Sequence, residues 1–335
     1  MTLSVAAQHF LDLAATGRPR PAIDFALELQ AGGVPMDRLI LDVLAPTQHQ
    51  VGRLWQSNQW TTAQEHASTA VVDGVLGAAA LQTPPALPTR GTVLVACTEE
   101  EYHTVPARMG VERLRHDRWE VVFLGASLPA QDLQRFAAHT EPDVIVLSCT
   151  VPLFLPGAAR CIAAGAELGL PVVAAGAGFG GTSARADRLG ASGWIGPESN
   201  PTDVLRGAGR PAGPPHLMHE EAVQLELGVD DLTAGCMAEM LVRMPQMSAY
   251  SERQLASTRS DLGHIFRYLA LAIDHDEAAV FDHFVSWLAE VLTARRVPPT
   301  VLTASMEIVE IILARAEFRR PAKLCSSARR GLLAA

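Results

Sequence analysis

Short runs of β-branched and aliphatic residues alternate with segments of helical spacing between residues 91 and 205, and this alternation constrains the fold most. Strands that alternate with helices imply βαβ units and therefore a parallel sheet. Ligands of such doubly wound sheets bind outside the carboxyl ends of the strands. The five runs, which favour a flavodoxin-like α/β domain, are Val93–Ala96, Val121–Leu124, Val144–Leu147, Val172–Ala175 and Trp194–Ile195.

Residues 1–83 show helical spacing throughout and are expected to form an N-terminal domain. Four apolar stretches are separated by short breaks, and short connections favour an antiparallel four-helix bundle. The proline-rich stretch 83–88 cannot continue a helix and predicts a linker. The four stretches are Val5–Leu13, Ile23–Leu29, Leu39–Leu54 and Ala67–Leu81.

Residues 206–218 contain three glycines and three prolines and predict a second linker. Helical spacing returns from His219, with three apolar stripes up to Ile312. An all-α domain is therefore expected over 219–320, and the basic tail from Arg319 is expected to be loose. The chain is predicted to have three domains, over 1–83, 91–205 and 219–320.

Charge and cysteine usage narrow the range of partners. The net charge of −9 argues against a direct nucleic-acid partner or an anionic membrane. No apolar run is long enough to span a bilayer, and no signal peptide is recognisable. The five cysteines are scattered without a CxxC pair, which suits a reducing, cytoplasmic environment.

The loop after the first predicted strand contains the strongest candidate metal ligand. Imidazole is a good ligand for cobalt and neighbouring metals, which makes His103 the candidate. Glu101 lies two residues earlier and is placed to accept a hydrogen bond from the other ring nitrogen, which fixes the tautomer. A solvated acidic loop with an incidental histidine is the alternative.

This loop resembles the cobalamin-binding module of corrinoid-dependent enzymes and cobalamin photoreceptors. Glu101-x-His103 matches the acidic-x-His core of the family pattern, although Pro106 replaces its glycine. Ser148-Cys149-Thr150 and Gly176-Ala177-Gly178 stand where the family has its serine and glycine elements. The resemblance implies that His103 displaces dimethylbenzimidazole as the lower ligand to cobalt. It also implies a cofactor-binding set of Glu101, Thr104, Ser148, Thr150, Gly176 and Gly178.

A second resemblance lies in the N-terminal segment. Trp55, nine intervening residues and then Glu65-His66 are similar to the signature of light-sensing cobalamin repressors, whose bundle caps the upper face of the corrin. In that family the tryptophan packs against the adenosyl group, and a histidine directly follows it. Gln56 occupies that position here, which leaves His66, a tyrosine or water for the upper ligand after illumination. Considered alone, the motif also fits a core tryptophan with an exposed Glu-His pair.

The order of bundle, cobalamin module and helical domain resembles photocobilins, which add a bilin such as biliverdin in a globin-like domain. A bilin needs cations for its propionates, polar partners and an apolar slot. The candidate contacts are Arg253, Arg259, His264 and Arg267. An ordinary solvated face is the alternative, because long charged residues mostly lie outside. Cys236 is a possible attachment site, but a buried thiol fits it equally.

These resemblances predict a non-enzymatic light sensor that binds adenosylcobalamin, with biliverdin as a possible second chromophore. Loss of the adenosyl group is expected to shift the bundle and change self-association, so a homodimer or higher homo-oligomer is expected. A corrinoid carrier for methyl transfer is the alternative, because it uses the same module. A radical mutase is excluded, since it needs a substrate barrel and the chain has no length for one.

Overall fold

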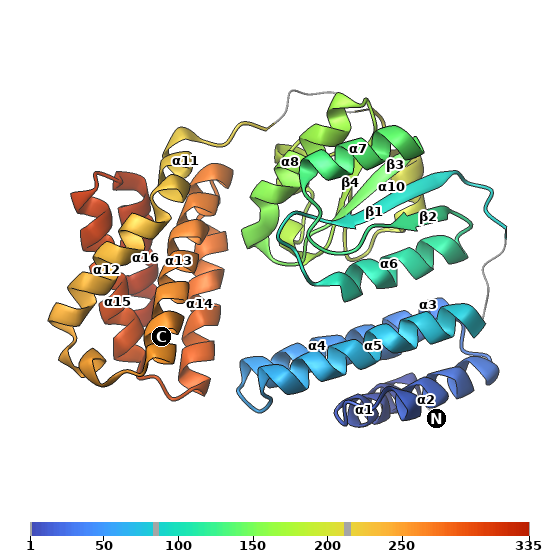
Figure 1. The fold of residues 1–335 in the computed structure, drawn as a ribbon, viewed down its shortest axis with the longest axis horizontal. Coiled ribbons are helices and arrows are strands. Elements are labelled where there is room, and N and C mark those ends of the chain that lie inside the picture. Colours follow the sequence, from blue (N-terminus) through green and yellow to red (C-terminus); the bar gives the residue numbers. More distant parts are fainter. Residues whose placement is uncertain (1, 83–86, 211–215, 335) are drawn as a thin grey trace. The chain divides into compact units, whose positions relative to one another are not determined.

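The chain divides into two compact units. The computed structural model describes residues 2–82, 87–210 and 216–334, which form units over Met1–His216 and Leu217–Ala335 (Figure 1). The first unit contains both the N-terminal helices and the sheet domain. Parts of both predicted linkers, 83–86 and 211–215, lie outside the described residues.

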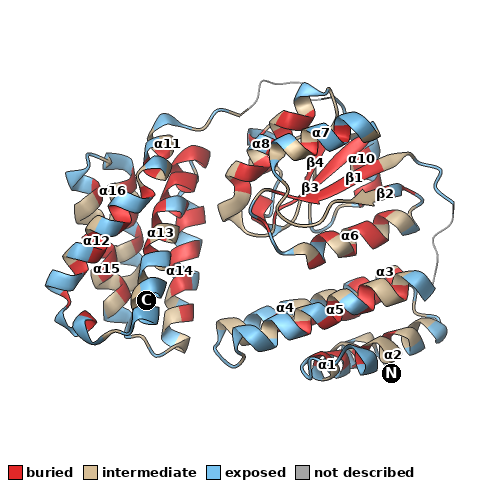
Figure 2. Ribbon diagram, in the orientation of Figure 1, coloured by how far each residue is buried: buried red, intermediate tan, exposed pale blue. Residues whose placement is uncertain are grey.

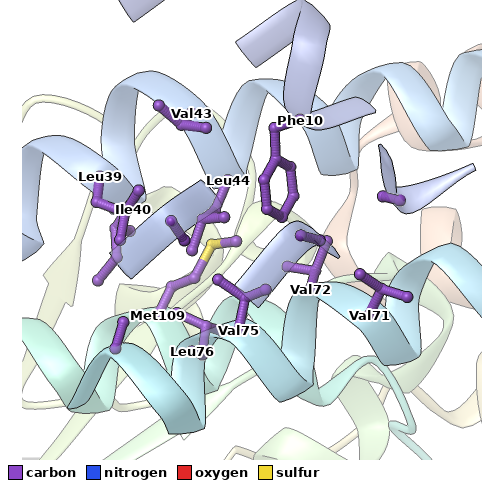
Figure 3. Packing of buried hydrophobic residues seen from close by; sticks show 14 of the residues in the cluster. Phe10, Leu39, Ile40, Val43, Leu44, Val71, Val72, Val75, Leu76 and Met109 are labelled. Carbon is purple, nitrogen blue, oxygen red and sulfur yellow. The ribbon is translucent and has the colours of Figure 1, made fainter. Parts of the chain in front are cut away.

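The N-terminal helices pack around one apolar core. Phe10, Leu44, Val72 and Leu76 are fully buried at its centre (Figure 3). Pro46 has no N–H to donate and would clash with an α-helical turn, and a π-helical turn precedes it. The elements are α1 (Leu3–Ala14), α2 (Pro19–Ala31), α3 (Met36–Leu39), π-helical η1 (Ile40–Leu44), α4 (Ala45–Gln56) and α5 (Thr62–Gln82).

The sheet domain contains five parallel strands in the order β2-β1-β3-β4-β5, which confirms the predicted doubly wound topology. Helices α6 and α10 pack on one face of the sheet, and α8 packs on the other against β3 and β4. The strands are β1 (Thr92–Cys97), β2 (Glu120–Phe123), β3 (Val144–Ser148), β4 (Val172–Ala175) and β5 (Gly193–Ile195). The helices are α6 (Thr104–His116), α7 (Ala130–Thr140), 3₁₀ η2 (Pro152–Phe154), α8 (Leu155–Glu167), 3₁₀ η3 (Ala177–Phe179), α9 (Ala184–Arg188) and α10 (Pro201–Gly207).

Helix α6 connects the bundle to the sheet domain. Val105 and Met109 lie on α6 but are buried in the core of the bundle (Figure 3). Two ion pairs flank this contact: Arg108 to Asp73 at 3.2 Å, and Arg113 to Asp37 at 2.6 Å. The helix that follows the His103 loop is therefore packed on both its neighbours.

The second unit is all-α, as predicted. Its central helix α13 begins with a capping box at Ser251 and ends at Asp276 in the left-handed region. The second half of α13 is buried almost continuously (Figure 2). The elements are α11 (Glu220–Leu227), α12 (Val229–Arg243), 3₁₀ η4 (Pro245–Ala249), α13 (Glu252–His275), α14 (Ala278–Ala294), α15 (Pro299–Arg315) and α16 (Arg319–Ala334).

The expectation of a loose tail from Arg319 is wrong. The tail forms helix α16, which packs along α15 and places Cys325 in the core. The Cys325 thiol donates to the carbonyl oxygen of Met306 at 3.3 Å, and Arg329 pairs with Glu310 at 3.2 Å. Its basic composition hides an amphipathic pattern whose buried positions are small residues. Among the described residues, no helix is long and apolar enough to cross a bilayer.

Candidate functional site

The loop between β1 and α6 pairs Glu101 with His103. The loop follows the carboxyl end of β1, and His103 stands at the N-cap of α6. The His103 Nδ1 lies 2.6 Å from Glu101 Oε1. Because an ionised carboxylate only accepts hydrogen bonds, Nδ1 carries the proton and Nε2 keeps its lone pair. The side chain of His103 is 58% exposed, so the ring is available to a ligand.

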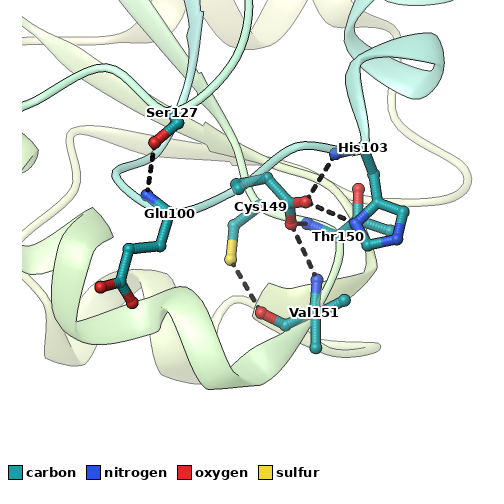
Figure 4. A network of polar contacts seen from close by, with 7 residues as sticks. Glu100, His103, Ser127, Cys149, Thr150 and Val151 are labelled. Carbon is teal, nitrogen blue, oxygen red and sulfur yellow. Dashed lines mark hydrogen bonds and ion pairs between the residues drawn. The ribbon is translucent and has the colours of Figure 1, made fainter.

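Glu101 is the buried anchor of this loop. Its side chain is fully buried, and Oε1 also accepts from the backbone N–H of His103 at 2.8 Å. Oε2 accepts from the N–H groups of Thr150 at 2.7 Å and Val151 at 3.1 Å (Figure 4). The carboxylate therefore joins the loops after β1 and β3. Burial alone would raise the pKa of Glu101, but these hydrogen bonds hold it below its usual value.

Charges from both parts of the first unit act on His103. The hydrogen bond to Glu101 raises the pKa of His103 above its ordinary value, although burial opposes this shift. The negative charges of Glu101 and of Glu65 raise it further. Glu65 belongs to helix α5 of the bundle, so the bundle motif and the sheet motif lie within electrostatic reach of each other.

The structure brings the bundle motif to one helical turn region, as its spacing predicts. Trp55 is the penultimate residue of α4, and Glu65 lies in the first turn of α5. The Trp55 Nε1 donates to Thr62 Oγ1 at 3.2 Å, which ties the two helix ends together. Glu65 forms a short hydrogen bond with His66, whose side chain is 74% exposed.

Sequence reasoning missed two residues that support this pair. Gln48 Nε2 donates to Thr69 Oγ1 at 2.8 Å, and Thr69 Oγ1 donates to Glu65 Oε1 at 3.0 Å. Thr69 follows Glu65 by four residues, a spacing that places both on one helical face and was available as a signal. Gln48 comes from a different helix, and no sequence pattern indicates it.

The remaining predicted cofactor contacts gather at the carboxyl edge of the sheet. Ser148 ends β3 and is nearly buried, while Thr104 opens α6 beside His103. The hydroxyl of Thr150 is buried and has no hydrogen-bond partner among the described residues. A buried, unpaired hydroxyl carries an energetic penalty unless a ligand satisfies it. This edge therefore fits a polar cofactor group next to the exposed His103 ring.

The two glycines after β4 have a reason that differs from the predicted one. The expectation is that Gly176 and Gly178 let a cofactor tail approach the backbone. A Cβ at Gly176 would lie 2.4 Å from the carbonyl oxygen of Cys149, and one at Gly178 would lie 2.8 Å from its Sγ. Gly176 also has a φ of +101°, which L side chains rarely adopt. Internal packing already requires glycine at both positions.

The C-terminal candidates are not gathered on one face. Arg253 and Arg259 are exposed and six residues apart, which places them about 120° apart around α13. Arg267 is exposed and pairs with Glu226 at 4.0 Å. His264 is half-buried, and burial, followed by the charge of Arg267, lowers its pKa. A single-faced arginine clamp is therefore not formed.

A different polar cluster lies on the half-buried side of α13. Asp261 is one turn before His264, and burial raises its pKa to about 6 despite the opposing charge of Arg295. Tyr268 follows one turn later and stacks on Phe284 with ring centroids 4.0 Å apart. Sequence reasoning missed Asp261, because a carboxylate in a charged helix is usually solvated.

Cys236 behaves as a buried thiol. It is fully buried on α12, and burial together with the nearby Glu239 raises its pKa to about 12. Thiolates, and not thiols, are the nucleophiles in covalent attachment. The structure therefore favours the buried-thiol alternative over covalent pigment attachment.

Comparison with known proteins agrees with this site. A family model described as a B12 binding domain matches residues 91–206, and a second B12 binding domain model matches residues 7–79. The chain is 34% identical over 129 residues to the HTH-type transcriptional repressor CarH of Myxococcus xanthus. That alignment covers 38% of this chain and 42% of the repressor, so the chain spans less than half of that relative's length.

A solved structure shares the fold. The monomethylamine corrinoid protein of Methanosarcina barkeri aligns with a TM-score of 0.51 at 16% identity, over 59% of this chain and 94% of that one. This likeness concerns the fold alone. With its sheet domain and its helical domain both matching B12 binding models, the chain is a cobalamin-binding protein.

Proposed function

We propose that the chain is a light sensor, not an enzyme, that binds adenosylcobalamin. In this proposal His103 is the lower axial ligand to cobalt, and Trp55 packs against the adenosyl group above it. The observation that carries the proposal is the pairing of Glu101 with an exposed His103, within electrostatic reach of Glu65 in the bundle. A ligand bound by His103 is thereby placed under the influence of the Trp55-x9-Glu65-His66 motif.

Each residue has a defined task. Glu101 holds the Nδ1 proton of His103, which leaves Nε2 for the cobalt. The unpaired hydroxyl of Thr150 supplies a hydrogen bond to the polar cofactor tail. The indole of Trp55, fixed by Thr62, supplies a large apolar surface for the adenosyl group. Bound adenosylcobalamin supplies a light-sensitive cobalt–carbon bond.

The rival function is a corrinoid carrier for methyl transfer. A carrier must expose the upper face of its cofactor to partner enzymes, whereas a sensor benefits from a tryptophan that contacts the upper group. Trp55 therefore separates the two functions. A sensor is expected to prefer adenosylcobalamin over methylcobalamin and hydroxocobalamin, and a carrier has no reason for that preference.

The test compares wild type with Trp55→Ala in the full chain. Each protein is mixed with adenosylcobalamin, methylcobalamin or hydroxocobalamin in the dark, and affinity is measured by retention of the cofactor. The account predicts that wild type prefers the adenosyl form and that Trp55→Ala loses this preference but still binds corrin. Equal affinity of wild type for all three forms would refute the sensor.

We also propose that the second unit binds a linear tetrapyrrole such as biliverdin, at the half-buried side of α13. Asp261 and His264 are half-buried polar groups there, next to the stacked rings of Tyr268 and Phe284. A buried carboxyl group and an imidazole are suitable partners for pyrrole nitrogens. This set replaces the exposed arginines as the primary contacts.

The pigment proposal is tested by adding biliverdin to the full chain and recording absorption. A sharpened long-wavelength band is expected for wild type, and it should weaken in Asp261→Asn and His264→Ala. Arg253→Ala is the matched control, because Arg253 lies on the same helix but is exposed. No band in wild type, or a band equally strong in all variants, would contradict the proposal.

A further inference from the structure

The first unit contains two carboxylate–imidazole pairs, and the second of them has no assigned role. Glu101 holds Nδ1 of His103 in the sheet domain, and Glu65 holds Nδ1 of His66 in the bundle. Metal-binding histidines almost always donate their other ring N–H to a carboxylate, carbonyl or water. The same arrangement on the bundle points to a second metal ligand.

The hydrogen bonds around Glu65 fix their own direction. The Gln48 amide donates to Thr69, and the single Thr69 hydroxyl proton is donated to Glu65 Oε1. Glu65 Oε2 is paired with Nδ1 of His66. Since a carboxylate cannot donate, Nδ1 of His66 carries the proton and Nε2 keeps its lone pair. His66 is thus prepared in the tautomer that a metal ligand needs.

The position of His66 relative to His103 is constrained. The charge of Glu65 raises the pKa of His103, so the two carboxylate–imidazole pairs are electrostatically coupled. The bundle is attached to α6, whose first residue follows His103, through the buried Met109 and the Arg108–Asp73 ion pair. The two pairs therefore belong to one compact unit.

We propose that His66 Nε2 is the upper axial ligand to cobalt(III) when the cofactor has no adenosyl group. The inference rests on the proposed binding of cobalamin through His103. Gln56, which stands where the similar repressors have a histidine, offers an amide, which is a weaker ligand than imidazole for this metal. Glu65, Thr69 and Gln48 are positioning residues that act through His66.

The exchange balances without an electron donor or acceptor. On hydroxocobalamin, the lone pair of His66 Nε2 forms the bond to cobalt(III). The hydroxide leaves with a solvent proton as water, and cobalt remains in the +3 state. Light is not required for this step when hydroxocobalamin is supplied directly.

The experiment adds hydroxocobalamin to the full chain in the dark and records the absorption spectrum and the rate at which cyanide displaces the upper ligand. Wild type is expected to show the spectrum of an imidazole adduct and slow displacement. His66→Ala should keep the cofactor but show the spectrum of hydroxocobalamin, with displacement at least about tenfold faster. Glu65→Gln should lie between them, since loss of a carboxylate partner weakens a metal ligand roughly 10–100-fold.

Two controls make the result specific. Gln56→Ala should behave as wild type, because Gln56 is not the ligand in this account, whereas an amide ligand would be lost in that variant. His49→Ala removes an exposed histidine from helix α4 and should also behave as wild type. An imidazole spectrum that persists in His66→Ala, or a hydroxocobalamin spectrum in wild type, would overturn the proposal.

Failure of this inference and failure of the proposed function have different signatures. If wild type does not retain hydroxocobalamin, the cofactor site itself is wrong. If it retains the cofactor but shows no imidazole adduct, only the assignment of His66 fails. The outcome is independent of whether illumination has any effect on the adenosyl form.

Discussion

The geometry of the cobalamin site depends chiefly on Glu101. One carboxylate accepts three backbone N–H groups and the Nδ1 of a histidine, and it joins two loops that are far apart in sequence. The acidic-x-His spacing predicts the contact with His103. The contacts with Thr150 and Val151 follow only from the parallel pairing of β1 with β3, which no local pattern encodes.

The first prediction concerns Glu101→Gln. The amide places two N–H donors against backbone donors in a buried site, so His103 loses its fixed tautomer. Cobalamin affinity is expected to fall roughly 10–100-fold, the usual effect of losing a partner of a metal ligand. The measurement is a binding titration, with the exposed neighbour substitution Glu100→Gln as the control. Equal affinity of both variants would contradict the anchoring role.

Small buried residues explain the main error made from sequence at the level of elements. Helix α16 is basic, and its core contacts are Cys325 and Ala328, which carry little hydrophobic signal. The strands and the long helices were predictable because their apolar periodicity is strong. The π-helical turn before Pro46 was not, because it depends on how one continuous helix accommodates a proline.

The second prediction concerns helix α16. A chain that stops after Phe318 exposes the face of α15 that α16 covers, so the second unit should lose on the order of 3 kcal/mol of unfolding free energy. A chain that stops after Arg330 keeps Cys325, Ala328 and the Arg329–Glu310 pair, and serves as the control. Denaturant unfolding measures both. Identical midpoints for the two truncations would show that α16 adds nothing.

The third prediction concerns Asp261 and pH. Burial raises its pKa from the ordinary 3.8 to about 6, so the folded state binds its proton more tightly than the unfolded state does. This contribution to stability is fully present below pH 4 and is lost as pH rises through 6.

Asp261→Asn is therefore expected to raise the melting temperature at pH 7.5 relative to wild type, and to have little effect at pH 4. The quantity measured is the difference in Tm between variant and wild type at each pH. Asp282→Asn, an exposed carboxylate on α14, controls for the change in net charge. A difference that does not change between the two pH values would contradict the buried, protonated carboxyl.

The helical cap and the sheet domain act as one unit, and the second helical unit follows a linker. The order of helices, doubly wound sheet and helices was predictable because the hydrophobic period changes twice along the chain. The packing of α6 into the bundle core was not predictable, since Val105 and Met109 look like ordinary sheet-covering residues.

The fourth prediction concerns self-association. If the adenosyl group holds Trp55 in place, its loss should alter the surface of the first unit and change the oligomeric state. Sedimentation velocity of the adenosylcobalamin complex, in the dark and after illumination, measures this change. The hydroxocobalamin complex is the control and should not respond to light. An identical sedimentation coefficient in both states would remove self-association as the output.

The central claim is that His103 ligates cobalt, and electron paramagnetic resonance tests it most directly. The protein is prepared with ¹⁵N-histidine, and its bound cobalamin is reduced to cobalt(II), which has one axial nitrogen. The account predicts that labelling changes each cobalt hyperfine line from a triplet to a doublet, and that His103→Ala abolishes this labelling effect. A triplet that persists in the labelled wild type, or a labelling effect that survives in His103→Ala, would contradict the claim.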